Sequence, residues 1–117
     1  MVEPGESGGI EQTAALLFVD DEERVLQGLK RILQPMNGQW EMTFATNGPD
    51  ALRILEETDT DVLVSDMRMP GMDGAEVLTR AMRISPATVR IALSGESDPA
   101  MRLRTVATAH QYLTKPC

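Results

Sequence analysis

The amino-acid sequence predicts an α/β protein in which helices cover both faces of a parallel β-sheet. Short apolar runs that suit buried strands alternate along the chain with segments whose apolar residues have helical spacing. The connections between them are short, which favours parallel strands joined by right-handed crossovers. Acidic, hydroxyl and lysine side chains stand where several strands end, and open parallel sheets bind their ligands at that edge.

The first half of the chain predicts two strands and two helices. The apolar run 14–19 is the first strand, and 21–34 is the first helix because its apolar residues have helical spacing after an acidic first turn. Proline, asparagine and glycine within 35–38 end this helix. The alternating segment 40–45 is the second strand. An Asn-Gly-Pro turn at 47–49 then begins the second helix, since proline is tolerated in a first helical turn.

The second half predicts three more strands, at 62–65, 88–93 and 110–114, with helices at 74–84 and 98–107 between them. A proline after an aspartate marks the start of the second of these helices. Three apolar residues form the thin inner face expected for that helix, Met101, Leu103 and Val106.

Length and composition limit the classes of function. The 117 residues are enough for one domain with one core, and a tail at 1–12, rich in glycine and glutamate, is expected to be disordered, which leaves 13–117 as the domain. A net charge of −7 disfavours binding to nucleic acid or to an anionic membrane. The sequence contains no apolar run of membrane-spanning length and no signal peptide, and its single cysteine, Cys117, excludes an internal disulfide. We therefore expect a cytoplasmic protein.

Five polar residues are expected at one edge of the sheet, Asp20, Asp21, Asp66, Ser94 and Lys115. Carboxylate oxygens are ligands that Mg²⁺ prefers, and three carboxylates repel one another unless a cation joins them. Phosphoryl transfer needs positioning and charge neutralisation, which the cation and Lys115 would supply, while Ser94 would donate a hydrogen bond. The sequence predicts a divalent-cation site that handles phosphate, with water or an aspartate as the nucleophile.

Taken singly, these residues have ordinary structural interpretations. Asp20 and Asp21 would stabilise a helix N-terminus, and Asp66 would cap a turn. Lys115 would be a solvated surface lysine, and the single histidine, His110, is interpreted as structural or as a surface residue. The convergence of the strand-end residues is what favours a functional site.

Four segments in order resemble the receiver domains of two-component response regulators. They are 17–22 (LFVDDE), 64–74 (VSDMRMPGMDG), 92–95 (ALSG) and 112–116 (YLTKP), and the resemblance spans about 14–116. It implies a flavodoxin-like sheet of five parallel strands in the order 2-1-3-4-5. It also implies phosphorelay signal transduction, in which the domain is an aspartyl phosphoprotein that uses magnesium.

The resemblance assigns a role to each residue that matches the family motifs. Asp66 is similar to the phosphoacceptor of the family. Asp20 and Asp21 are similar to its Mg²⁺-binding acid pair, and the backbone carbonyl of Arg68 is the expected third protein ligand beside Asp66.

The remaining assignments concern phosphate contact and switching. Lys115 matches the phosphate-contacting lysine, Ser94 the switch hydroxyl and Tyr112 the switch aromatic. The implied partners are a sensor histidine kinase or phosphotransfer protein, and an output domain; the last residues are similar to receivers joined to HD-GYP or HDOD output domains. Such a domain assists only its own phosphorylation and dephosphorylation and is not an enzyme for an external substrate.

Three alternatives follow from the same residues. A pseudo-receiver would bind partners without becoming phosphorylated. A Mg²⁺-dependent phosphatase of the haloacid-dehalogenase type needs Asp-x-Asp at the first strand, whereas residue 22 is glutamate. A nucleotide-binding domain would need a glycine-rich phosphate loop, which the sequence lacks.

Receiver domains normally have a fifth helix after the Lys-Pro pair, whereas this chain stops at Cys117. We expect the protein to continue or to be a trimmed form. Without that helix, strands one and five and the first helix would expose apolar surface. We therefore expect a homodimer or an exchange of elements between two copies.

Overall fold

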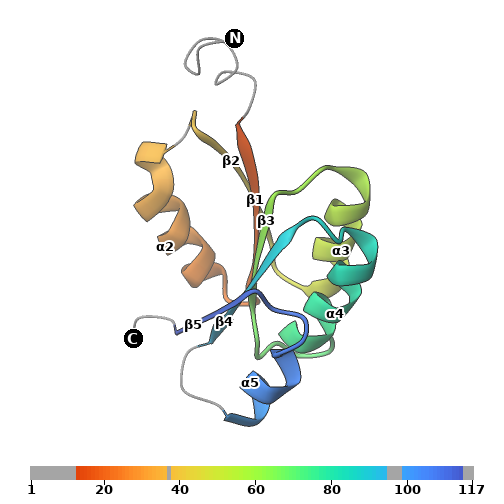
Figure 1. Cartoon of the computed structure of the whole chain (residues 1–117). Coiled ribbons are helices and arrows are strands. Elements are labelled where there is room, and N and C mark those ends of the chain that lie inside the picture. The colour runs from red at the N-terminus through yellow and green to blue at the C-terminus, as the bar shows by residue number, and fades with distance from the viewer. Residues whose placement is uncertain (1–12, 37, 95–98, 115–117) are drawn as a thin grey trace.

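The computed structural model describes residues 13–36, 38–94 and 99–114 and contains one parallel sheet (Figure 1). The strand order is β2-β1-β3-β4-β5, as predicted. The strands are β1 (Ala14–Val19), β2 (Trp40–Ala45), β3 (Val62–Asp66), β4 (Val89–Ser94) and β5 (Gln111–Thr114). The expected tail at 1–12 and residues 115–117 lie outside the described residues.

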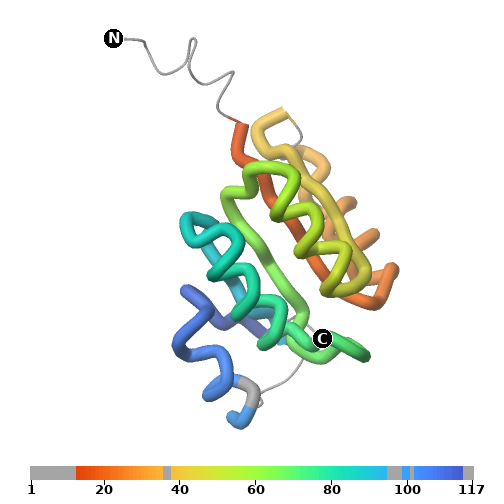
Figure 2. The backbone as a smooth tube through the Cα atoms, turned by 90° about the vertical axis from the view of Figure 1, so that its right-hand side faces the viewer, coloured from red at the N-terminus to blue at the C-terminus, as the bar shows by residue number. Residues whose placement is uncertain are grey.

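The helices cover the two faces of the sheet unequally. On one face lies α2 (Glu23–Leu33), which is followed by the short 3-10 helix η1 (Gln34–Met36). The other face carries α3 (Gly48–Glu57), α4 (Gly74–Ile84) and α5 (Pro99–Thr105), which lie side by side in Figure 2. Every predicted strand and helix is present. None of the helices among the described residues has the length and apolar character needed to cross a membrane.

The larger core lies between the sheet and the helices α3 and α4. Strand residues that point to this face, such as Leu17 and Leu63, are almost completely buried against both helices. Two methionines from the loop after β3, Met67 and Met69, are buried in the same core. Alternation along each strand therefore directs every second residue into this layer.

The smaller core lies between the sheet and α2. It is built around Leu16, Phe18 and Leu26, which are buried. The rings of Phe18 and Phe44 stack with centroids 5.3 Å apart, and the Lys30 ammonium lies 5.0 Å from the Phe44 centroid. These contacts hold α2 over β1 and β2 and leave β4 and β5 outside this core.

The apolar surface expected on β5 and on the first helix is present, with Ile32 of α2 72% exposed, and it also includes β4. Val89 of β4 is 41% exposed and Leu113 of β5 is 46% exposed. The expectation that β1 would be exposed is wrong, because α2 covers it and Leu16 and Phe18 are buried. Within the sheet, the large exposed apolar side chains therefore lie beyond β3, on β4 and β5.

The predicted inner face of α5 is also wrong for the residues whose side chains are described. Leu103 and Val106 are each 74% exposed, whereas Thr105 is buried. Helical spacing in a seven-residue segment leaves the choice of buried face open, and the polar Thr105 occupies it here.

Candidate functional site

Two buried aspartates stand next to each other where adjacent strands end. Asp20 follows β1 directly, and Asp66 is the last residue of β3. Val19 pairs with Ser65 in the register of these strands, so both carboxylates emerge at the same edge. Asp20 is 2% exposed and Asp66 is 5% exposed. Acidic side chains are rarely buried without a charge or hydrogen-bond partner, which marks this edge as more than a surface loop.

The neighbouring Asp21 is exposed and completes a cluster of three acids. Asp20, Asp21 and Asp66 each offer a carboxylate oxygen within 4.8 Å of the others. Oδ1 of Asp20 accepts a hydrogen bond of 2.9 Å from the backbone N–H of Glu22, which fixes the orientation of that carboxylate. Hard divalent cations bind such oxygen ligands, so the donor set fits Mg²⁺.

The loop after Asp66 is held by backbone contacts at both of its ends. The N–H of Met67 donates to the carbonyl of Leu93 (3.1 Å), and the N–H of Gly74 donates to the carbonyl of Met67 (3.0 Å). Gly74 also lies so close to the backbone of Asp66 that an added Cβ would collide with the Asp66 carbonyl oxygen and lie 2.7 Å from the Cα of Met67. The position of Asp66 therefore depends on a glycine that begins α4.

Asp73 closes this loop with two different contacts. Its Oδ1 accepts a hydrogen bond from the N–H of Glu76 (3.0 Å) and thereby caps α4. Its Oδ2 lies 2.9 Å from Nη1 of Arg104, which belongs to α5. The loop that follows the candidate phosphoacceptor is therefore tied to a second helix.

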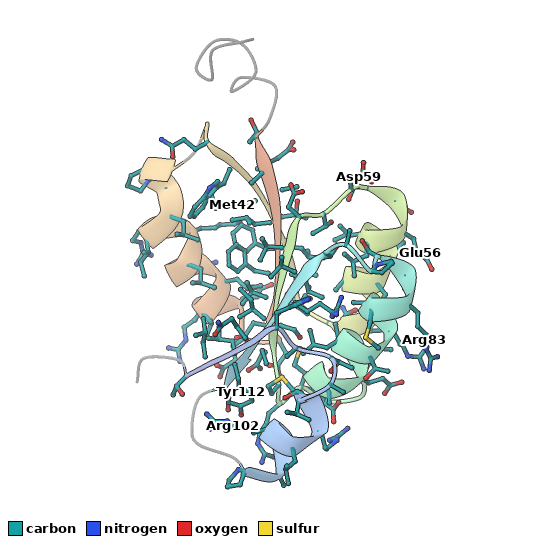
Figure 3. The ribbon with its side chains drawn as sticks, viewed as in Figure 1. Met42, Glu56, Asp59, Arg83, Arg102 and Tyr112 are labelled. Atoms are coloured by element: carbon teal, nitrogen blue, oxygen red, sulfur yellow. The ribbon has the colours of Figure 1, made fainter. Side chains whose placement is uncertain are left out.

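Ser94 and Tyr112 lie on the two strands beyond Asp66. Ser94 ends β4 and is buried. Tyr112 pairs with Ala92 of β4, and its half-buried ring packs against the larger core. The guanidinium carbon of Arg102 lies 4.6 Å from the ring centroid, and Figure 3 shows Arg102 of α5 beside Tyr112 of β5. The buried Tyr112 hydroxyl has no hydrogen-bond partner among the described residues.

The structure thus brings together the three predicted acids and places Ser94 at the end of the neighbouring strand. Arg68 lies in the loop two residues after Asp66, with an exposed side chain. Lys115 lies outside the described residues. The roles assigned to these residues remain predictions. His110 precedes β5 at the opposite edge, and its Nδ1 accepts a hydrogen bond from the N–H of Arg90, as expected for a structural histidine.

Sequence reasoning missed Arg102, Arg104 and Asp73. The aspartate had a signal, because it precedes a helix and is followed three residues later by glutamate. The two arginines had none, since an arginine on a short amphipathic segment is ordinarily solvated. Their contacts depend on where β5 and the loop after β3 come to lie, which is tertiary information.

Comparison with known proteins agrees with this geometry. The family model of the response regulator receiver domain matches residues 16–117. The uncharacterized transcriptional regulatory protein YesN of Bacillus subtilis is 32% identical over 110 residues, which are 87% of this chain and 28% of YesN. The first four curated relatives are matched over only 21% to 47% of their lengths.

Two solved structures have the same fold. The signal receiver domain of an HD domain-containing protein from Pseudomonas fluorescens Pf-5 superposes with a TM-score of 0.84 at 31% identity, covering 90% of this chain and 84% of that one. The response regulator protein TrrA from Thermotoga maritima, in complex with Mg²⁺ and BeF, has a TM-score of 0.79 at 30% identity, covering 89% and 88%. Together with the family match, these similarities show that the chain belongs to the response regulator receiver domains.

Proposed function

We propose that this domain accepts a phosphoryl group on Asp66 from a phosphohistidine of a sensor histidine kinase or phosphotransfer protein, and then changes conformation to control an output domain or partner. The observation that carries the proposal is the buried Asp66 within 4.8 Å of two further carboxylates at one edge of a parallel sheet. A structural aspartate would not need two acidic neighbours, because each adds repulsion.

The transfer is a simple exchange of bonds to phosphorus. A carboxylate oxygen of Asp66 forms a bond to phosphorus as the N–P bond of phosphohistidine breaks and the imidazole nitrogen keeps the electron pair. Asp20, Asp21, Asp66 and the Arg68 carbonyl would hold Mg²⁺, which when bound neutralises charge on the phosphoryl oxygens. Water later attacks the acyl phosphate and regenerates the carboxylate with release of phosphate. The domain therefore assists its own phosphorylation and hydrolysis and turns over no external substrate.

The role of Lys115 and Ser94 is to neutralise and to hydrogen-bond the phosphoryl oxygens. The buried position of Ser94 at the end of β4 supports its part of this role. Tyr112 would follow the movement of Ser94, because the two residues lie on adjacent paired strands. Such a switch shifts an existing equilibrium between two conformations.

The test is phosphorylation by acetyl phosphate with Mg²⁺, monitored by intact mass. The wild type is expected to gain one phosphoryl group, Asp66→Asn none, and chelation should prevent the gain. Asp59→Asn is the matched control, because Asp59 is an exposed acid at the other end of the sheet (Figure 3). A wild type that gains nothing would favour a pseudo-receiver. Release of phosphate from a phosphomonoester would favour the phosphatase.

We propose an output domain of a kind found in a similar protein. The solved receiver from P. fluorescens Pf-5 is part of an HD domain-containing protein, which supports an output of the HD-GYP or HDOD type in a longer protein. The low pI, about 4.6, argues against direct binding of this domain to nucleic acid or an anionic membrane. A cytoplasmic location is consistent with the proposed kinase partner.

We further propose self-association through the exposed apolar surface of β4 and β5. If Leu113 is buried between two copies, Leu113→Lys should weaken dimerisation at least about tenfold, because burial of one leucine contributes about 1.5–3 kcal/mol. Sedimentation velocity over a wide concentration range measures this. The control is Leu103→Lys on α5, which lies on the other face of the sheet. A monomer at all concentrations contradicts the proposal, and dissociation by Leu103→Lys alone would assign the contact to α5.

A further inference from the structure

Helix α5 is short and is not held by an apolar face of its described side chains. It has seven residues, fewer than the roughly 12–15 needed for an isolated helix to persist in water. Among those of its side chains that the structure describes, only Thr105 is buried, and Leu103 is 74% exposed. Polar contacts with neighbouring elements are therefore needed to fix the position of this helix.

One such contact links α5 to the loop that follows Asp66. Nη1 of Arg104 lies 2.9 Å from Oδ2 of Asp73, and Nη2 lies 3.5 Å from Oδ1. The two side chains are 53% and 26% exposed, so solvent screens the pair and its contribution to stability is small. Its importance is geometric, because Asp73 is adjacent to Gly74, which packs against the backbone of Asp66.

A second contact links α5 to the strand that carries the candidate switch aromatic. The guanidinium of Arg102 lies over the Tyr112 ring at 4.6 Å from its centroid, within the range of a cation–π interaction. The hydroxyl of this ring is buried and has no hydrogen-bond partner within the described part of the chain. An unsatisfied buried hydroxyl disfavours this ring position relative to one in which the hydroxyl is hydrated.

The two arginines leave the helix in different directions. They are two residues apart, which corresponds to about 200° around a helix of 3.6 residues per turn. One side chain can therefore reach the loop after β3 while the other reaches β5, and α5 is tied to both. A displacement of α5 changes both contacts together.

We propose that Arg102 and Arg104 are positioning residues that restrain the phosphorylation site in its unphosphorylated conformation. Arg104 fixes the loop after Asp66 through Asp73, and Arg102 fixes the ring of Tyr112. Loss of either contact releases α5 and lets the ring move, which shifts the population toward the phosphorylated-like conformation. The proposal rests on the proposed function only for its effect on phosphorylation; the coupling of α5 to Tyr112 stands on the contacts alone.

The first experiment follows Tyr112 without Mg²⁺ or phosphate. Tyr112 is the only tyrosine of the chain, so 3-fluorotyrosine gives a single fluorine NMR signal. We expect Arg102→Gln to move this signal toward that of a solvent-exposed ring and Arg102→Lys to restore much of it. Arg104→Gln and Asp73→Asn should each move the signal in the same direction, because each removes the contact between these two residues. Asparagine at position 73 still caps α4, so the effect is confined to that contact. The double variant Arg104→Gln/Asp73→Asn should move the signal no further than either single variant.

Arg80→Gln is the matched control, since Arg80 pairs with Glu76 within α4 and links no second element. The coupling is overturned if the fluorine signal of Arg102→Gln equals that of Arg80→Gln, or if Arg104→Gln and Asp73→Asn leave it unchanged. Additive shifts in the double variant would also overturn it, because two residues of one contact must act as a unit.

The second experiment measures the rate of phosphorylation by acetyl phosphate with Mg²⁺. Arg102→Gln and Arg104→Gln should each be phosphorylated about two- to fivefold faster than the wild type, and Arg80→Gln at the wild-type rate. Arg80→Gln changes the net charge by the same amount, and Arg102→Lys, which keeps a cation over the ring, should be phosphorylated at close to the wild-type rate. A shifted fluorine signal with an unchanged rate would overturn the restraint on Asp66. If the wild type takes no phosphoryl group, the proposed function fails, and the fluorine signal alone decides whether α5 is coupled to Tyr112.

Discussion

Mg²⁺ is expected to raise the unfolding temperature of the wild type and to have no such effect on Asp20→Asn. The ion would bind the folded cluster of Asp20, Asp21 and Asp66 and not the unfolded chain. At a hundredfold excess over its Kd, such binding adds roughly 2–3 kcal/mol to the free energy of unfolding, or at least about 5 °C. Without Mg²⁺, the variant should be at least as stable as the wild type, because it removes one of three converging negative charges.

Thermal unfolding followed by circular dichroism, with and without Mg²⁺, measures both effects, and the phosphorylation rate provides a third readout. Asparagine can still accept the hydrogen bond from the N–H of Glu22, so the local backbone is retained. Asp59→Asn again serves as the control and should keep the full response to Mg²⁺. An equal response in wild type and Asp20→Asn would show that these acids do not hold the ion.

Gly74→Ala is expected to impair both folding and phosphorylation. An added methyl group would meet the carbonyl oxygen of Asp66 and lie 2.7 Å from the Cα and 2.8 Å from the Sδ of Met67. Backbone atoms cannot yield as a flexible side chain can, so we expect a loss of about 1–3 kcal/mol in the free energy of unfolding. Displacement of Asp66 should also slow phosphorylation about tenfold to a hundredfold. Chemical denaturation and the acetyl phosphate assay measure the two effects.

Gly71→Ala provides the comparison, because Gly71 lies in the same loop but needs glycine for its backbone conformation and not for lack of space. Its φ is +79°, and an added Cβ would meet nothing within 4 Å. Alanine there costs about 1 kcal/mol of backbone strain without pushing on Asp66. We expect Gly71→Ala to lose stability but to be phosphorylated at nearly the wild-type rate. If both variants lose phosphorylation equally, the close approach at Gly74 is not the cause.

The sequence was sufficient for the fold and for the meeting of the acids. Apolar runs and helical spacing located every strand and helix because each element buries a face with its own period. Parallel strands must end at a common edge, so Asp20 and Asp66 could be placed together before the structure was known. The Asn-Gly-Pro turn at 47–49 begins α3 as predicted, with proline in the first helical turn.

What escaped prediction depends on contacts between distant segments. Leu103 of α5 and Val106, which follows the helix, are exposed to solvent, because the buried position of a seven-residue helix is decided by its neighbours. The exposure expected for β5 is present, but β1 is buried and β4 is exposed instead, since the stacked Phe18 and Phe44 hold α2 over the other half of the sheet. Arg104 contacts Asp73, which lies 31 residues earlier, and no local sequence pattern indicates such a contact.

The burial of Met67 and Met69 has a consequence for how the domain loses activity. These two methionines lie in the loop that follows Asp66, and both are buried among the packed side chains of α3 and α4. The loop that shapes the site is therefore part of the cooperative unit formed by that core, and it cannot melt separately. In a denaturant titration, the ability to accept phosphate should disappear in the same transition as the native fold, with no folded but inactive species before it.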